Sequence, residues 1–280
     1  PGGEMGIHMQ IKRLRKHPVV TRGEAVYFYI RDQLNSQGSF ALTTSWMNQF
    51  DRADLWSSYI EELMSLNLTG RLIATGKYLK AKYSNSTIFR NEYEDILSEH
   101  IPLRRDERNR LFRLASGAVD ASLENISDGT RNALTSWAKT HHPNCYLCGR
   151  FLEFSNEDSI ARFTLDHLWP RDFGGDSIEE NLLPACKDCN GHHKKNFPTW
   201  AMTNVQSLLL GFAPSENSLK RVTGSSRYAI HHRYVQSVAI EKQVTIKEAY
   251  IVVGPSEGVR VVRPLEFGHF FNLANHSESP

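Results

Sequence analysis

Four cysteines constrain the fold of this chain more than any other feature of its sequence. They form two pairs, Cys145-x-x-Cys148 and Cys186-x-x-Cys189, and the remaining positions of the 280-residue chain contain no cysteine. Two CxxC pairs are typical of a tetrathiolate zinc site. Disulfides within the pairs would close very small loops and stabilise the fold little, and a redox CxxC needs no second copy. The sequence therefore predicts structural zinc at these four residues.

The composition is that of an ordinary soluble globular protein. Hydrophobic residues make up 40% of the chain, charged residues 23%, and the net charge is +2, so the total charge does not demand a nucleic-acid partner. Two basic clusters, residues 11–17 and 102–113, are either phosphate-contacting surfaces or solvated helix faces. No apolar run approaches the roughly 20 residues that span a bilayer, and residues 1–10 lack a secretory signal. We expect a cytoplasmic protein without a membrane partner, in a reducing compartment.

Hydrophobic spacing predicts an α+β protein whose first part is mostly helical. Helices are predicted at residues 21–34, 43–67 (one or two helices), 104–120 and 127–142. Residues 69–83 are ambiguous between a short strand pair and a loop. Towards the end of the chain, residues 225–243 predict a helix and residues 249–267 predict a β-hairpin, because two β-branched runs flank a Gly-Pro-Ser-Glu-Gly turn.

The segment between the cysteine pairs predicts a strand, a loop, a second strand and a helix. Residues 162–167, "RFTLDH", alternate apolar and polar positions, and residues 182–186, "LLPAC", can return beside them. The loop between them contains Gly174-Gly175, and a helix can begin near Lys187. A zinc ion that joins both cysteine pairs would close this unit, which is too small to have a core of its own.

Several polar residues of this unit have the chemistry to cut a phosphodiester. His167 is a suitable general base near neutral pH, and Asp166 offers a hard carboxylate oxygen to a metal such as Mg²⁺. Neighbouring side chains of a strand point to opposite faces, so both residues serve one site only if the strand twists or bulges. Asn190 offers an amide oxygen to the same metal. His193 and Lys194 lie three and four residues later, as candidates for a phosphate contact or an additional ligand.

The order of these residues resembles the HNH endonuclease family, also called ββα-metal or His-metal finger nucleases. The shared elements are Asp166-His167, Gly174-Gly175, Asn181-Leu182, Cys186-x-x-Cys189-Asn190 and Lys194-Lys195. The upstream segment Cys145–Gly149 is similar to the zinc-stabilised, four-cysteine subset of that family. The resemblance covers about 50 residues, and five separated elements in the same order make it specific.

The resemblance implies a role for each site residue. His167 is then the general base, Asp166 and Asn190 are ligands of a catalytic Mg²⁺ or Mn²⁺, and the Asn181 side chain bonds loop backbone and so orients the base. The implied reaction is hydrolysis of DNA that leaves a 3′-hydroxyl and a 5′-phosphate. A monomer would nick, and a homodimer would break both strands. Family analogy also suggests a role in prokaryotic restriction or anti-phage defence, with a protein partner as another means of control. RNA is a weaker alternative substrate.

Four regions follow from these predictions. Residues 1–10 are an expression remnant or a disordered start, 11–140 a helical region of unknown role, 141–200 the HNH module, and 201–280 a C-terminal helix and β-hairpin extension. The alternative is a non-catalytic zinc-binding module that binds nucleic acid or protein and does not hydrolyse its partner. Such a module needs the cysteines but does not need Asp166, His167, Asn181 and Asn190.

Overall fold

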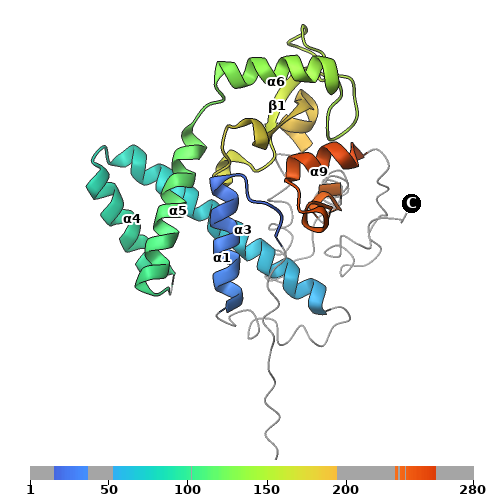
Figure 1. The fold of residues 1–280 in the computed structure, drawn as a ribbon. Coiled ribbons are helices and arrows are strands. Elements are labelled where there is room, and N and C mark those ends of the chain that lie inside the picture. Colours follow the sequence, from blue (N-terminus) through green and yellow to red (C-terminus); the bar gives the residue numbers. More distant parts are fainter. Residues whose placement is uncertain are drawn as a thin grey trace, which may run out of the picture.

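The computed structural model describes residues 16–36, 53–101, 103–193, 231–232, 234–236 and 238–256. Five helices precede the only sheet of this described part: α1 (Arg22–Ser36), α3 (Ala53–Lys82), α4 (Ser86–His100), α5 (Arg105–Leu123) and α6 (Asp128–His141). Strands β1 (Phe163–His167) and β2 (Leu182–Cys186) follow, with the short helical turns η2 (Arg171–Phe173), η3 (Glu179–Asn181) and η4 (Cys189–His193), and then helix α9 (Ile246–Val253). The predicted α+β class, with a mostly helical first part, is confirmed (Figure 1).

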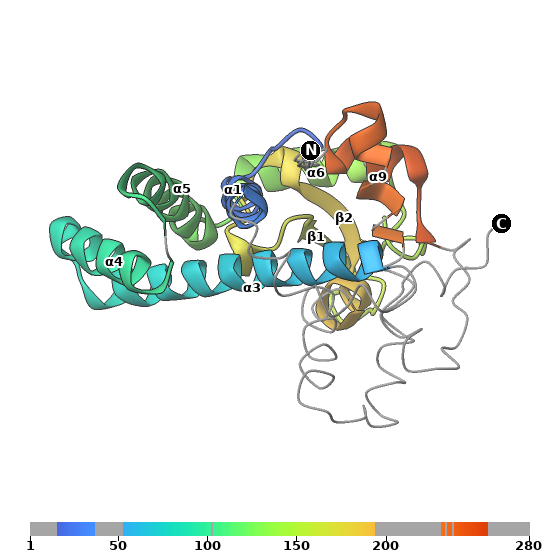
Figure 2. The same cartoon turned by 90° about the horizontal axis from the view of Figure 1, so that it is seen from below.

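Helices α1, α3, α4 and α5 pack around a shared hydrophobic core, with α1, α4 and α5 arranged along the long helix α3 (Figure 2). The core side chains repeat at helical spacing. Buried members include Val26, Ile73, Tyr93, Leu97 and Leu111. Within the described helices, none is long and apolar enough to cross a bilayer.

The predicted helix at residues 21–34 is confirmed as α1, and a reciprocal capping arrangement forms its start. The Thr21 hydroxyl accepts a hydrogen bond from the backbone N–H of Glu24 (3.1 Å), and the Glu24 carboxylate accepts one from the backbone N–H of Thr21 (2.8 Å). This reciprocal pair satisfies backbone donors that a helix start leaves without partners. It fixes the position where α1 begins and therefore where Arg22 and Gly23 lie.

Helix α3 corrects the prediction of a strand pair or loop at residues 69–83, because the helix continues to Lys82. Gly70 and Gly76 lie within this helix and permit close packing. A Cβ at Gly76 would lie 2.4 Å from a Val119 methyl group, and one at Gly70 would lie 3.0 Å from the Phe173 ring. The predicted helix at 43–67 is confirmed from Ala53 onwards, and residues 43–52 lie outside the described part.

The predicted helices at 104–120 and 127–142 are confirmed as α5 and α6. Helix α4 was not predicted. The helical prediction at 225–243 is confirmed for its described residues, 231–232, 234–236 and 238–242.

Helix α9 corrects the predicted hairpin at 249–267, since residues 249–253 are helical and residues beyond 256 lie outside the description. A capping box between Thr245 and Glu248 begins the helix, and Ile246, Ala249 and Tyr250 share its buried side. Spacing of three and four residues between these side chains is typical of an amphipathic helix.

Strands β1 and β2 form the predicted antiparallel pair, in an unbroken register that pairs Asp166 with Leu183 and His167 with Leu182. One face carries Leu183, which packs with Val235, Ala249 and Tyr250 of the C-terminal helices. The opposite face carries Leu165 and Leu182, which pack with Leu134 of α6. The sheet is therefore covered on both faces.

Candidate active site and metal centre

The four cysteines come together at one end of the sheet. Their sulfur atoms all lie within 4.8 Å of one another, and Cys148 Sγ is 3.8 Å from Cys186 Sγ. A tetrahedral zinc ion with Zn–S bonds of about 2.3 Å holds its sulfurs roughly 3.8 Å apart. All four cysteines are free rather than disulfide-bonded. They are positioned to bind a metal ion, and their geometry fits Zn²⁺.

Hydrogen bonds between the four cysteine side chains shift their pKa values in opposite directions, as expected where sulfurs crowd around a cation site. The Cys145 side chain lowers the pKa of Cys148 to about 7 by hydrogen bonding, and lowers that of Cys186 well below the usual thiol value. Hydrogen bonds with neighbouring thiols raise the pKa of Cys145 and of Cys189. Four sulfurs this close cannot all be thiolates unless a cation balances their charge. Soft sulfur donors favour zinc over a hard metal such as Mg²⁺.

Backbone hydrogen bonds tie the first cysteine pair to the second. The Tyr146 N–H donates to Pro184 O of β2 (3.0 Å), and the Cys145 N–H donates to Arg150 O (2.8 Å). Gly149 takes a left-handed conformation (φ 70°), which favours glycine in the tight turn after Cys148. The turn thus presents its two sulfurs to Cys186, the last residue of β2.

Asp166 lies on the sheet face that the C-terminal helices cover. It is only 5% exposed, and its Oδ2 accepts a 2.6 Å hydrogen bond from the Tyr146 hydroxyl. Burial raises the pKa of Tyr146 well above its usual value, and the Asp166 carboxylate raises it further, so the tyrosine keeps its proton and is the donor. Tyr250 of α9 meets the Tyr146 ring edge-on at 4.8 Å. The cysteine turn and α9 together hold this carboxylate in place.

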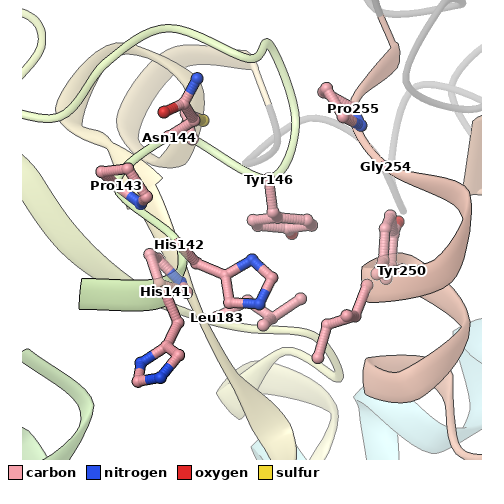
Figure 3. Close-up of a pocket in the computed structure, with 12 residues that line it drawn as sticks. His141, His142, Pro143, Asn144, Tyr146, Leu183, Tyr250, Gly254 and Pro255 are labelled. Carbon is pink, nitrogen blue, oxygen red and sulfur yellow. The ribbon is translucent and has the colours of Figure 1, made fainter. Parts of the chain in front are cut away.

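A cavity of about 280 Å³ lies beside this contact, between the end of α6, the cysteine turn, β2 and α9. The rings of His142, Tyr146 and Tyr250 surround the cavity, whereas His141 points away from it (Figure 3). Burial lowers the pKa of His142, and the neighbouring His141 and Lys247 lower it further. The cavity wall is therefore aromatic and largely neutral near pH 7.

His167 leaves β1 on the opposite face, as the alternation of a strand requires. No bulge interrupts the β1–β2 register, and His167 is the last residue of the ladder, so a twist that lets both side chains serve one site can lie only at this end of the strand. His167 Nε2 lies 3.0 Å from Ser177 Oγ. Asp166 and His167 are thus neighbours at the end of one strand, with side chains held by different partners.

Asn181 pins the loop that connects the strands. Its Oδ1 accepts a hydrogen bond from the Trp169 N–H (2.7 Å), and its Nδ2 donates to Trp169 O (3.1 Å) and Asp176 O (2.8 Å). The side chain is 3% exposed. One amide therefore joins both ends of the loop that follows His167.

Asn190 lies in η4 against β1. Its Nδ2 donates to Thr164 Oγ1 (3.1 Å) and to Leu165 O (3.3 Å). Thr164 and Asp166 point to the same face of β1 because they are two residues apart. Asn190 is thereby brought beside the strand that carries Asp166 and His167. His193 is the last residue of η4. Its side chain and the whole of Lys194 lie outside the described part of the chain.

The helical region holds the same loop from outside. The Arg22 N–H and Nε donate to the two carboxylate oxygens of Asp176 (2.6 and 2.9 Å). The Arg171 guanidinium donates to Ser122 O at the end of α5 (3.0 Å), and a Cβ at Gly23 would lie 2.2 Å from Phe173 O. Trp169 and Phe173 pack on α1 and α3. Sequence reasoning missed Arg22, Tyr146, Asp176 and Ser177, since their partners are distant in the chain.

Comparison with known proteins adds one finding to this geometry. The family model of the HNH endonuclease matches residues 145–196, which begin at the first cysteine of the cluster and end just after η4. Searches of curated proteins and of solved structures gave no match. The matched segment contains the cysteine cluster, both strands, the loop between them and η4. Residues 145–196 of this chain are therefore similar to the HNH endonuclease domain, and their four cysteines are gathered as a zinc-binding subset of that family requires.

Proposed function

We propose that the protein is a metal-dependent endonuclease that hydrolyses phosphodiester bonds of DNA. The observation that carries this proposal is the arrangement around β1 within the HNH domain: Asp166 and His167 end the strand, Asn181 pins the following loop, and Asn190 bonds to the strand from η4. A zinc module that only binds would not need this second set of polar residues.

His167 is the proposed general base. It takes a proton from a water molecule whose oxygen forms the new bond to phosphorus, while the bond from phosphorus to the 3′-oxygen breaks and that oxygen takes up a proton. The products are a 3′-hydroxyl and a 5′-phosphate. Neutral imidazole is available for this step near pH 7. The loop contacts of Asn181 support the proposal because they restrain the backbone that follows the base.

Asp166 and Asn190 are the proposed ligands of a catalytic Mg²⁺ or Mn²⁺. Carboxylate and amide oxygens suit such hard cations, and the hydrogen bonds of Asn190 to Thr164 and Leu165 O keep it beside β1. When bound, the metal would stabilise negative charge on the phosphate and the leaving oxygen. His193 or Lys194 is a candidate for contact with the substrate phosphate.

The four cysteines are the proposed site of a structural Zn²⁺. We infer a cytoplasmic location, where thiols stay reduced, and a role in prokaryotic restriction or anti-phage defence, which the HNH domain supports by analogy alone. Homodimerisation or a protein partner would decide between nicking and a double-strand break.

A nicking assay on supercoiled plasmid tests the proposed activity. The zinc-loaded protein is expected to yield open circles with Mg²⁺ or Mn²⁺ and none with EDTA. DNA ligase should reseal these circles, because it requires a 3′-hydroxyl and a 5′-phosphate. Circles that ligase cannot reseal would contradict the proposed bond cleavage. Cleavage of RNA but not DNA would change the substrate, and failure to cut either would favour the binding module.

A further inference from the structure

Ser177 connects His167 to the end of helix α5. Its hydroxyl donates a hydrogen bond to the backbone oxygen of Glu124 (2.9 Å) and lies 3.0 Å from His167 Nε2. Glu124 is the residue that ends α5. Ser177 is buried, at 9% exposure. Three groups from the loop, β1 and α5 therefore form one short chain of hydrogen bonds.

The number of protons in this chain fixes the direction of each bond. A serine hydroxyl has one proton and two lone pairs. Since the carbonyl oxygen of Glu124 can only accept, the single proton of Ser177 is used in that bond. Ser177 Oγ must then accept from His167, so Nε2 carries the imidazole proton and the lone pair lies on Nδ1.

We propose that Ser177 is a positioning residue that holds His167 in the Nε2–H tautomer, with Nδ1 as the atom that takes the proton from water. This inference rests on the proposed role of His167 as the base. The wrong tautomer would place a proton where the base needs its lone pair. A hydroxyl at position 177 therefore determines which ring nitrogen can react.

The surrounding contacts make Ser177 a rigid partner. The preceding residue, Asp176, is held through its carboxylate by Arg22 (2.6 and 2.9 Å) and through its carbonyl oxygen by Asn181 (2.8 Å). The backbone that carries the Ser177 hydroxyl is therefore held by Arg22 and by Asn181, so the hydroxyl keeps its position beside His167.

Two variants and a matched control test the role of Ser177 through the rate of nicking. Ser177→Ala is expected to lower the single-turnover rate by about 10- to 100-fold, part of the roughly 10²- to 10⁴-fold that a general base supplies, with DNA affinity unchanged. Ser177→Thr keeps a hydroxyl and should restore most of the rate. Ser122→Ala is the control, because this buried hydroxyl donates to Val119 O at the same helix end (2.7 Å) and, in the described residues, makes no hydrogen bond with His167. It should cut at the wild-type rate.

A double variant separates positioning from a general loss of structure. Adding Ser177→Ala to His167→Ala should change the residual rate by less than about twofold, since a positioning residue has no effect without the base. A further loss as large as in the wild-type background would overturn the proposal.

Nitrogen-15 NMR of the histidine rings tests the tautomer without reference to activity. The His167 signals are identified by their disappearance in His167→Gln. The expected spectrum above the titration of this ring has the proton on Nε2, and Ser177→Ala should shift it towards a mixture of tautomers. A proton on Nδ1 in the wild type, or an unchanged spectrum in Ser177→Ala, would overturn the proposal. If the protein does not cut DNA, the proposed function fails, while the spectrum still decides the tautomer.

Discussion

At the scale of single residues, the hydrogen bond from Tyr146 to Asp166 links the two proposed metal sites. Tyr146 lies between Cys145 and Cys148, and its hydroxyl bonds the carboxylate at 2.6 Å. Residues that bond a metal-ligating carboxylate orient it, and their removal typically lowers metal affinity or activity about 10- to 100-fold. The turn that carries Cys145 and Cys148 therefore helps to orient Asp166, a proposed ligand of the catalytic metal.

Tyr146→Phe is expected to raise the Mg²⁺ concentration for half-maximal nicking by about 10-fold while zinc content stays unchanged. The measurement is a Mg²⁺ titration of plasmid nicking, with zinc assayed by atomic emission. Tyr234→Phe, an exposed tyrosine of the C-terminal part, is the control. A normal Mg²⁺ requirement in Tyr146→Phe would show that the hydrogen bond does not orient the ligand.

His231 gives the stability of the protein a dependence on pH. The side chain is 1% exposed, and neither ring nitrogen has a hydrogen-bond partner among the described residues. Burial lowers the pKa of His231, and the backbone of Gly254 opposes this shift less strongly. The unfolded chain therefore binds a proton at His231 more readily than the folded chain does. The contribution of the neutral, buried ring to the free energy of unfolding is complete above about pH 6.5, and it is lost as the pH falls towards the pKa of the folded state.

His231→Phe is expected to flatten the dependence of unfolding free energy on pH between pH 7 and pH 5. Urea denaturation at several pH values measures this dependence. The exposed His141, replaced in His141→Gln, is the control and should leave the slope as in the wild type. An unchanged slope in His231→Phe would contradict the assignment.

At the scale of elements, two segments that were predicted as strand or loop are helical. In α3, the missing side chains of Gly70 and Gly76 permit contact with Val119 and Phe173. In α9 the β-branched residues 251–253 suggested a strand, and the capping box at Thr245 together with burial of Tyr250 decides for a helix. Local propensity is a weak guide where long-range packing determines the outcome.

Gly76→Ala and Gly117→Ala should change stability in opposite directions. A Cβ at Gly76 would overlap Val119 at 2.4 Å, so we expect a loss of about 1–3 kcal/mol from overpacking. A Cβ at Gly117 would meet Arg22 Cδ at an ordinary 3.5 Å, so the gain in helix propensity should stabilise the protein by about 0.5–1 kcal/mol. Thermal and urea denaturation measure both. Equal effects would refute the packing explanation of the α3 glycines.

At the scale of the whole molecule, the helical region supports the loop of the HNH domain. Asp176 is buried and accepts two hydrogen bonds from Arg22 of α1, whereas Asp172 of the same loop is exposed and faces Lys77 at 3.6 Å. These contacts join segments about 150 residues apart in the sequence. They give helices α1 and α3 a role in holding the proposed base and its partner in position.

Asp176→Asn is expected to destabilise the protein by about 1–3 kcal/mol, because one of the two buried carboxylate oxygens that accept from Arg22 is replaced by an NH₂ donor and the negative charge is lost. Hydrogen exchange should rise at residues 174–177. The matched variant Asp172→Asn should cost less than about 0.5 kcal/mol, since exposed ion pairs contribute little. Equal effects of the two substitutions would mean that α1 does not hold the loop.

The sequence predicted the parts of the site that depend on short spacing. Both strands and the gathering of the four cysteines follow from local patterns and from a family resemblance over consecutive residues. The supports of the site, Ser177 with Glu124 O and Asp176 with Arg22, depend on contacts across the fold. Such pairs leave no local signal, so only the structure reveals them.

The most direct test of the central claim is the nicking rate of His167→Ala measured together with its zinc content. Separate structural and catalytic centres predict a rate at least about 100-fold below wild type, with the zinc content and melting temperature of the wild type. Cys186→Ser, by contrast, should lose zinc, stability and cutting together. Wild-type nicking by a zinc-loaded, folded His167→Ala protein would contradict the assignment of His167 as the base.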